Sequence, residues 1–174
     1  MELSFAAGGF LKYLLQSIEW EKVMPLTNRV NLMSYDLVSG YSTVTGHHTS
    51  LYSTPGTSES ADKAIHHLDS IGVPMNKVVI GAAFYARTWE GVAGINKGLY
   101  QKGKFKDFIG YNQFNTRLSR DSGFIFYHDS VAKASYAYNP GTKIFATFDD
   151  SVSVAEKTKY ALEKKLNGIM FWEL

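Results

Sequence analysis

Three apolar runs of this 174-residue sequence end abruptly in aromatic and charged side chains, and chemistry is expected at these endings. The residues concerned are Tyr35 and Asp36 after the first run, Tyr85 and Arg87 after the second, and Trp172 and Glu173 after the third. The carboxyl ends of parallel strands meet at one rim, where ligands bind. We therefore expect these side chains to converge on a single cleft, although they are far apart in the sequence.

The elements that must position these residues follow from the spacing of apolar side chains. Strands are predicted over residues 2–7, 29–35, 77–84 and 168–172. Helical spacing begins at Leu11 and again after Ser58 or Ser60. A third helix begins with a predicted capping box of Ser153 and Glu156. Right-handed crossovers make such strands parallel, so about four parallel strands are expected.

Residues 89–148 interrupt this alternation of strands and helices. Their short, aromatic-rich stretches are typical of β-strands and predict an inserted α+β subdomain. Two architectures accommodate the rest of the chain: a small open doubly wound sheet, or part of a (β/α)8 barrel, which needs eight strands. The spacing alone leaves both open.

Composition and charge argue against several function classes. With 45% hydrophobic and 20% charged residues, the chain is of ordinary globular type. A net charge of +2, scattered basic residues and the lack of a phosphate-binding loop argue against nucleic acid as a partner. The sequence has no cysteine and no apolar run near the roughly 20 residues that span a membrane. The pairs His47–His48 and His66–His67 are adjacent in sequence rather than four residues apart, so we expect no metal site.

Four segments carry a resemblance to a known family: residues 31–36, 46–52, 81–89 and 168–173. In this order they closely resemble the second half of the chitinases of glycoside hydrolase family 18. The resemblance implies an α/β fold, the C-terminal half of a (β/α)8 TIM barrel with an inserted small α+β subdomain. Residues 1–88 would hold barrel strands five to seven, residues 89–148 the insertion, and residues 149–174 the last helix and strand.

The family's fourth-strand signature, Asp-x-x-Asp-x-Asp-x-Glu, supplies the general acid and does not occur in these 174 residues. The resemblance implies a parent glycosidase that hydrolyses β-1,4-linked N-acetylglucosamine glycans by a substrate-assisted retaining mechanism without a cofactor. This chain alone would be inactive. Its implied partners are chitin or a related oligosaccharide and the missing N-terminal barrel half. The parent would be secreted or extracytoplasmic, although no signal peptide precedes the first predicted strand.

The resemblance also implies roles for single residues. The implied catalytic residues are Tyr35 and Asp36, and the implied substrate-binding residues are Met33, Tyr85, Arg87 and Trp172. Tyr35 would hold the acetamido group of the substrate for attack, and Asp36 would lie near the acid and the sugar hydroxyls. The indole of Trp172 would form the floor under the sugar. Trp89 is a further candidate for stacking on a flanking sugar.

Each of these residues also has a purely structural interpretation. Tyr35 and Asp36 could end a strand, with Asp36 acting as a cap. Arg87 could bond loop carbonyls, and Trp172 could be a core residue. Glu173 points to the opposite side of its strand from Trp172, so it is not expected to replace the missing acid.

Two other functions stay open from the sequence. A family member without the acid would be a non-hydrolytic, lectin-like carbohydrate-binding barrel. An inactive half-barrel fragment would self-associate, because unpaired strand edges and an uncovered apolar face favour association. The residue at the fourth-strand acid position of the parent separates a hydrolase from a binder, and the mass in solution tests self-association.

Overall fold

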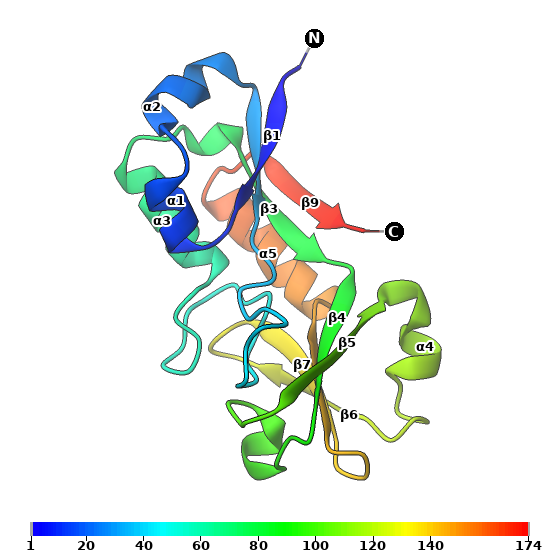
Figure 1. Ribbon diagram of the computed structural model, residues 1–174. Coiled ribbons are helices and arrows are strands. Elements are labelled where there is room, and N and C mark those ends of the chain that lie inside the picture. The colour runs from blue at the N-terminus through cyan, green and yellow to red at the C-terminus, as the bar shows by residue number, and fades with distance from the viewer. Residues whose placement is uncertain (1, 174) are drawn as a thin grey trace.

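The computed structural model describes residues 2–173, which form a parallel sheet flanked by helices and a second, antiparallel sheet (Figure 1). The parallel sheet has the order β1-β2-β3-β9, with β1 (Ser4–Gly8), β2 (Arg29–Met33), β3 (Val78–Ala83) and β9 (Gly168–Trp172). Each neighbouring pair of these strands runs parallel. The prediction of four parallel strands is confirmed, and within the described residues they form an open sheet rather than a closed barrel.

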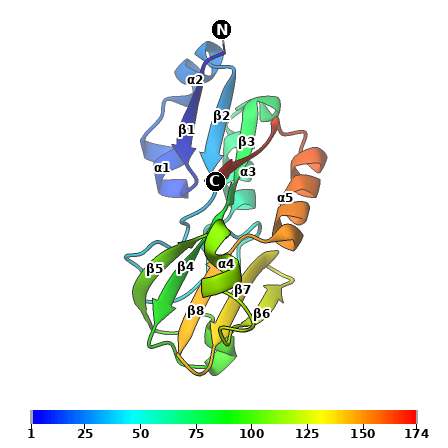
Figure 2. The same ribbon diagram turned by 90° about the vertical axis from the view of Figure 1, so that its right-hand side faces the viewer.

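Helices connect these strands and cover one face of the parallel sheet. The α-helices are α1 (Leu11–Gln16), α2 (Trp20–Val23), α3 (Ala61–Ser70), α4 (Phe114–Arg117) and α5 (Ser151–Glu163), and the 3-10 helices are η1 (Met24–Leu26), η2 (Met75–Lys77), η3 (Ile95–Gly98) and η4 (Tyr111–Gln113). Helices α1, α3 and α5 lie around β1, β2 and β3 (Figure 2). Leu14, Leu32, Ile65, Ile80 and Tyr160 belong to the core cluster that these helices and strands share. None of the helices in residues 2–173 is both long and apolar enough to cross a membrane.

The starts of α3 and α5 test the predicted helix caps. Ser60, one of the two predicted candidates, caps α3 and accepts a hydrogen bond from the backbone N–H of Lys63 at 3.1 Å. The predicted capping box of Ser153 with Glu156 is wrong. Asp150 is the N-cap of α5 and Ser153 its reciprocal partner, because the Asp150 side chain accepts two backbone N–H bonds of the first turn.

The antiparallel sheet begins directly after the parallel one. Its order is β5-β4-β8-β7-β6, with β4 (Tyr85–Glu90), β5 (Lys104–Gly110), β6 (Ile125–Asp129), β7 (Ala134–Asn139) and β8 (Ile144–Phe148). Only Phe84 separates β3 from β4, and Arg87 already pairs with Phe108 and Thr147 of the second sheet. Tyr85 and Arg87 therefore open the antiparallel sheet, ahead of residue 89, where the insertion was predicted to start.

Trp89 belongs to the core of the antiparallel sheet. Its side chain is fully buried in a cluster with Tyr136 and Phe145, and its Nε1 donates to the carbonyl of Ser42 at 2.9 Å. The expectation that Trp89 stacks on a sugar is wrong, because the ring presents no face to solvent.

Candidate active site

A cleft of about 670 Å³ opens where the carboxyl ends of the parallel strands meet the antiparallel sheet. The predicted site residues that line it are Asp36, Tyr85, Arg87 and Trp172. Met33 and Tyr35 are not among its lining residues, whereas Glu173, expected on the opposite side of the strand from Trp172, lines the cleft together with it. Further lining residues, not singled out from the sequence, are Phe84, Asp107, Phe108, Gln113 and Arg117. The structure therefore brings together side chains that follow three different strands.

Asp36 is the centre of the polar contacts at this cleft. It lies just after β2 at a sharp turn, with a φ of 60° that Asp adopts more readily than most residues. Its Oδ1 accepts hydrogen bonds from the hydroxyl of Tyr85 at 2.5 Å and from Nε of Arg87 at 2.5 Å. Both donors are on one face of β4, since alternate residues of a strand point the same way. These bonds tie the segment after β2 to the start of the second sheet.

The surroundings of Asp36 favour its charged form. Burial raises the pKa of its carboxyl, but the hydrogen bonds from Arg87 and Tyr85 lower it by more, so the pKa lies well below 3.8. Burial and the bond to Asp36 raise the pKa of Tyr85, which stays a neutral donor. In residues 2–173, the second carboxylate oxygen, Oδ2, accepts no hydrogen bond from the protein. That oxygen is free to bond a ligand.

His48 supports Asp36 from inside the protein, although its sequence pattern suggested only a metal-like pair. The ring is fully buried, with Nδ1 3.3 Å from the backbone nitrogen of Asp36 and 3.6 Å from Oδ1. A backbone N–H can only donate, so Nδ1 is the acceptor and the proton of the ring is on Nε2. Burial lowers the pKa of His48 by more than the nearby Asp36 and Asp149 raise it, so the ring is neutral at pH 7. We call Tyr35, Asp36, His48, Tyr85 and Arg87 the Asp36 cluster.

Tyr35 packs on the protein side of the Asp36 cluster. It is only 7% exposed, and its ring meets that of Tyr85 edge to face at 6.1 Å. A Cβ added at Gly81 would lie 2.6 Å from Cε1 of Tyr35, so the ring needs a glycine there. Burial raises the pKa of Tyr35 to about 12, with the charge of Asp36 adding to the effect. Tyr35 is thus a neutral phenol near pH 7, and Met33 before it is half-buried at the end of β2.

Exposed aromatic rings form one wall of the cleft. Trp172 at the end of β9 is 55% exposed, so its interpretation as a core residue is wrong. Phe84 stacks on Phe171 with ring centres 4.7 Å apart, and Tyr111 lies 5.8 Å from Phe84. Phe108 on β5 is 63% exposed. Such flat surfaces beside a carboxylate suit a ligand with both apolar faces and polar edges.

The two histidines of the first pair bond different partners. Nε2 of His47 lies 3.0 Å from Oδ2 of Asp129 at the end of β6, whereas His48 faces Asp36. His47 therefore joins the loop after β2 to the antiparallel sheet. Within residues 2–173 no group of three or more His, Cys, Asp or Glu side chains lies close enough to hold a metal ion.

Comparisons with known proteins place the chain in one family. The family model described as Glycosyl hydrolases family 18 matches residues 1–174. The chain is 31% identical over 190 aligned residues to Chitinase A1 of Niallia circulans. The alignment covers 99% of this chain and 27% of that protein. Among solved structures, it resembles a family 18 N-acetylglucosaminidase from Paenibacillus barengoltzii, with 36% identity and a TM-score of 0.90 over 99% of this chain and 51% of that chain. A chitinase from Bacillus thuringiensis has 29% identity and a TM-score of 0.93 over 99% of this chain and 31% of that one. The chain thus spans about half or less of the length of these relatives.

Proposed function

Because this chain belongs to the glycosyl hydrolases of family 18, we propose that its cleft is part of the substrate site of a chitinase-like glycosidase. The proposed substrate is a β-1,4-linked N-acetylglucosamine glycan, since the similar proteins are named as chitinases and an N-acetylglucosaminidase. The observation that carries the proposal is Asp36, held as a carboxylate with one oxygen free in the same cleft as the exposed indole of Trp172. Together they offer a charged acceptor for polar groups and a flat surface for the apolar face of a sugar ring.

In the proposed mechanism the acetamido oxygen of the substrate attacks the anomeric carbon, and the configuration is retained. This is an exception to the scheme in which two protein carboxylates do the work. Tyr35 donates a hydrogen bond to the acetamido group, which a neutral phenol does at pH 7 without titrating. Asp36 and Arg87 bond the polar groups around the reacting centre, and Met33 packs beside them. An internal nucleophile reacts fast only when it is held close to the attack geometry, and holding it there is the contribution proposed for these residues.

We assign the four parallel strands to barrel strands five to eight, and the antiparallel sheet, which begins at Tyr85 rather than at the expected residue 89 and ends with residue 148, to the inserted subdomain. Support comes from the order β1-β2-β3-β9 and from the antiparallel sheet between β3 and α5. Protonation of the leaving oxygen needs a carboxylic acid of raised pKa, and the Asp-x-x-Asp-x-Asp-x-Glu signature that would supply it does not occur in this sequence. We therefore expect the 174-residue chain to bind the glycan without hydrolysing it.

Glycan binding by the isolated chain tests the proposal directly. Isothermal titration calorimetry measures the affinity of each variant for hexa-N-acetylchitohexaose. In the native chain the glycan should also quench or shift the fluorescence of Trp172, since Trp20 and Trp89 are buried. Trp172→Ala should weaken binding at least about tenfold, a loss typical of a stacking contact. Tyr41→Ala is the matched control, because Tyr41 is 98% exposed and is not among the residues that line the cleft. Equal affinity of the Trp172→Ala variant, or no binding by the native chain, would overturn the proposal.

A non-hydrolytic, lectin-like binding barrel is the second candidate function. What favours it is that the proposed sugar contacts of Asp36 and Trp172 involve no acid, so they would serve a binder as well as a hydrolase. A complementation experiment separates the two. The chain is mixed with the first-half polypeptide of a family 18 chitinase that contains the fourth-strand Glu, and a chromogenic chito-oligosaccharide is added. Turnover supports the hydrolase, binding without turnover supports the lectin, and turnover by the chain alone that Asp36→Asn abolishes would show an internal acid.

Association is the third proposal about this chain. Within the described residues, β1 pairs only with β2 and β9 only with β3, so each has one edge without a partner strand. Such edges template pairing with another chain. We expect the isolated chain to self-associate, or to bind a polypeptide that adds the remaining barrel strands. Sedimentation velocity tests this expectation, and a stable monomer at high concentration would contradict it.

A further inference from the structure

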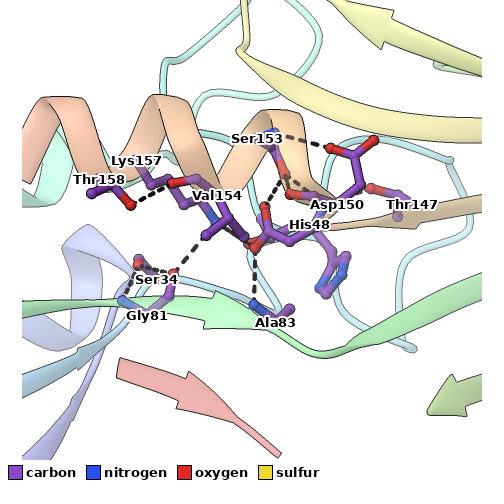
Figure 3. Close-up of polar contacts among 12 residues, drawn as sticks. Ser34, His48, Gly81, Ala83, Thr147, Asp150, Ser153, Val154, Lys157 and Thr158 are labelled. Atoms are coloured by element: carbon purple, nitrogen blue, oxygen red, sulfur yellow. Dashed lines mark hydrogen bonds and ion pairs between the residues drawn. The ribbon is translucent and has the colours of Figure 1, made fainter. Parts of the chain in front are cut away.

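A buried ion pair links helix α5 to the segment that follows β8 (Figure 3). Nζ of Lys157 and Oδ2 of Asp149 are 2.6 Å apart, and both side chains are completely buried. Every other Lys or Arg ion pair in residues 2–173 is at least partly exposed. Burying two charges costs several kcal/mol per ion before their attraction offsets it, so the pair by itself is weak evidence for a stabilising role.

The pair is bonded to groups of two further elements. Oδ2 of Asp149 accepts hydrogen bonds from the backbone N–H of Ala83 at 2.9 Å and from the hydroxyl of Thr49 at 2.8 Å. Nζ of Lys157 donates to Oγ1 of Thr49 at 2.6 Å and lies 3.4 Å from the carbonyl oxygen of Gly81. The pair therefore holds the end of β3 and the loop at Thr49 at the same time.

On the side of β3, the anchored residues lie next to the phenols of the site. A Cβ at Gly81 would lie 2.6 Å from the ring of Tyr35. The N–H of Gly81 donates to the hydroxyl of Ser34 at 2.9 Å, and that hydroxyl donates to the carbonyl oxygen of Gly81 at 3.1 Å (Figure 3). Ala83 is two residues before Tyr85 in the sequence. A shift of β3 would thus move both rings.

On the side of the loop, the anchored residue lies next to the support of the carboxylate. Thr49 follows His48, whose Nδ1 accepts the backbone N–H of Asp36. The backbone of His48 is held as well: its N–H donates to Oγ1 of Thr147 at 3.3 Å, and its carbonyl accepts the N–H of Leu37 at 2.9 Å. A shift of this loop would displace Asp36.

From these contacts we propose that Lys157 and Asp149 are positioning residues that set the geometry of the Asp36 cluster. They touch no lining residue of the cleft as donors or acceptors and act through β3 and the loop at Thr49. Their importance for glycan binding rests on the proposed function, whereas their effect on the Asp36 cluster does not. The two questions are therefore measured separately.

The test variant carries Lys157→Met together with Asp149→Asn, which removes both charges at nearly constant volume. One positive and one negative charge leave together, so the net charge is unchanged. The charge of Asp149 also acts directly on His48, and the Thr49→Val variant described below, which keeps both charges, separates geometry from charge. The groups that face the Asp36 carboxylate, namely Tyr35, His48, Tyr85 and Arg87, are left intact. Carbon-13 NMR follows the titration of the Asp36 carboxyl, and nitrogen-15 NMR reports the protonation state and hydrogen bonding of His48, both without a glycan.

We expect the pKa of Asp36 in this variant to rise by about one unit or more, the size of one weakened hydrogen bond to a charged group. The control is Tyr160→Phe on the same helix, since the buried Tyr160 hydroxyl donates to Asp62 of α3 at 2.8 Å and not to β3. This control should lower stability and leave both NMR readouts unchanged. A double variant that folds with native readouts at Asp36 and His48 overturns the proposal.

A second variant keeps the proposal testable if the double variant does not fold. Thr49→Val keeps the shape and the ion pair but removes the hydroxyl that joins the pair to the His48 loop. We expect the nitrogen-15 signals of His48 and the pKa of Asp36 to shift in the same direction as in the double variant. Unchanged readouts in Thr49→Val overturn the positioning role. If the variants show these shifts but the native chain binds no hexa-N-acetylchitohexaose, only the proposed function is contradicted.

Discussion

Asp36 follows β2 of the parallel sheet and Asp149 follows β8 of the antiparallel sheet, and the two carboxylates differ in how many of their hydrogen bonds the protein supplies. Asp149 is completely buried, and its two oxygens accept four hydrogen bonds, from Ser153, Lys157, Thr49 and the backbone of Ala83. Asp36 lies at the cleft with Oδ1 bonded to Tyr85 and Arg87 and, among residues 2–173, no protein donor for Oδ2.

The difference separates Asp149, an anchor, from Asp36, the proposed binding group. A carboxylate whose acceptor capacity is filled by the protein has nothing to offer a ligand, and it fixes the elements that its donors belong to. A carboxylate with one filled and one free oxygen is held in place and still able to bond a substrate. The following predictions test this contrast, from the largest expected effect to the smallest.

The largest loss of unfolding free energy is expected when Asp149, the anchor, loses Lys157. Lys157→Met alone leaves the charge of Asp149 buried without compensation, which costs about 3–5 kcal/mol of unfolding free energy. Urea denaturation measures the loss. Lys159→Met is the control, because the side chain of Lys159 is 73% exposed and substitution there should change stability by less than about 0.5 kcal/mol. Equal effects at the two positions would show that Asp149 is not an anchor.

A smaller loss of unfolding free energy is expected at Gly81 of β3, which lies between Lys157 and Tyr35. Gly81→Ala places a Cβ 2.6 Å from the ring of Tyr35 and 3.1 Å from the carbonyl of Leu32, and such overpacking costs about 1–3 kcal/mol. The variant should also shift the NMR signals of Tyr35. Gly141→Ala is the matched control, since its Cβ would meet only Oδ1 of Asn139 at 3.4 Å. A fully stable Gly81→Ala chain would mean that the ring moves freely and that β3 does not position it.

A pH-dependent effect is expected at the binding carboxylate. The pKa of Asp36 in the folded chain lies below the usual 3.8, so its charge contributes stability that is complete above about pH 5 and is lost as the pH falls toward the lower folded value. The side chain is 35% exposed, so solvent screening limits the contribution to about 1 kcal/mol. The native chain should exceed Asp36→Asn by this amount at pH 6, and the difference should shrink on acidification below pH 3.8. Urea titrations at several pH values measure it, and a difference that grows on acidification would contradict the assignment.

The smallest effect on stability is expected at the aromatic wall. Trp172 is 55% exposed, so Trp172→Ala should change the unfolding free energy by about 0.5 kcal/mol or less, while it weakens glycan binding strongly. Thermal unfolding followed in the same buffer as the binding assay checks both parts. A loss of stability as large as that of Lys157→Met would return Trp172 to the role of a core residue.

Much of the parallel sheet and its helices could be predicted, because the spacing of apolar residues is regular in these segments. The four parallel strands and the cap at Ser60 follow patterns of period two, runs of apolar residues and capping chemistry that act over a few residues. The start of the antiparallel sheet was missed, since Phe84 joins β3 to β4 without a turn signal such as Gly or Pro. The capping box was misplaced because Asp150 and Ser153 compete with another plausible Ser–Glu pair one turn later.

The candidate site was predictable only in part. Tyr85 and Arg87 could be placed on one face from their alternation, and the structure has both bonded to Asp36. His48 carries no local signal for its contact with Asp36, because the contact depends on how the loop folds back. Lys157 looks in sequence like any charged residue of a surface helix, and only the packing of α5 on β3 buries it.

The sequence by itself determined where apolar runs end in aromatic and charged side chains, because side-chain type and periodicity are local properties. It also placed the chain in its family through four motifs in order. The tertiary structure alone decided which oxygen of Asp36 is free, which side chains lie behind it, and that Asp149 is buried against Lys157 and β3. Those outcomes depend on groups more than forty residues apart, such as Thr49 and Lys157, whose approach is set by the packing of whole elements and not by any local pattern.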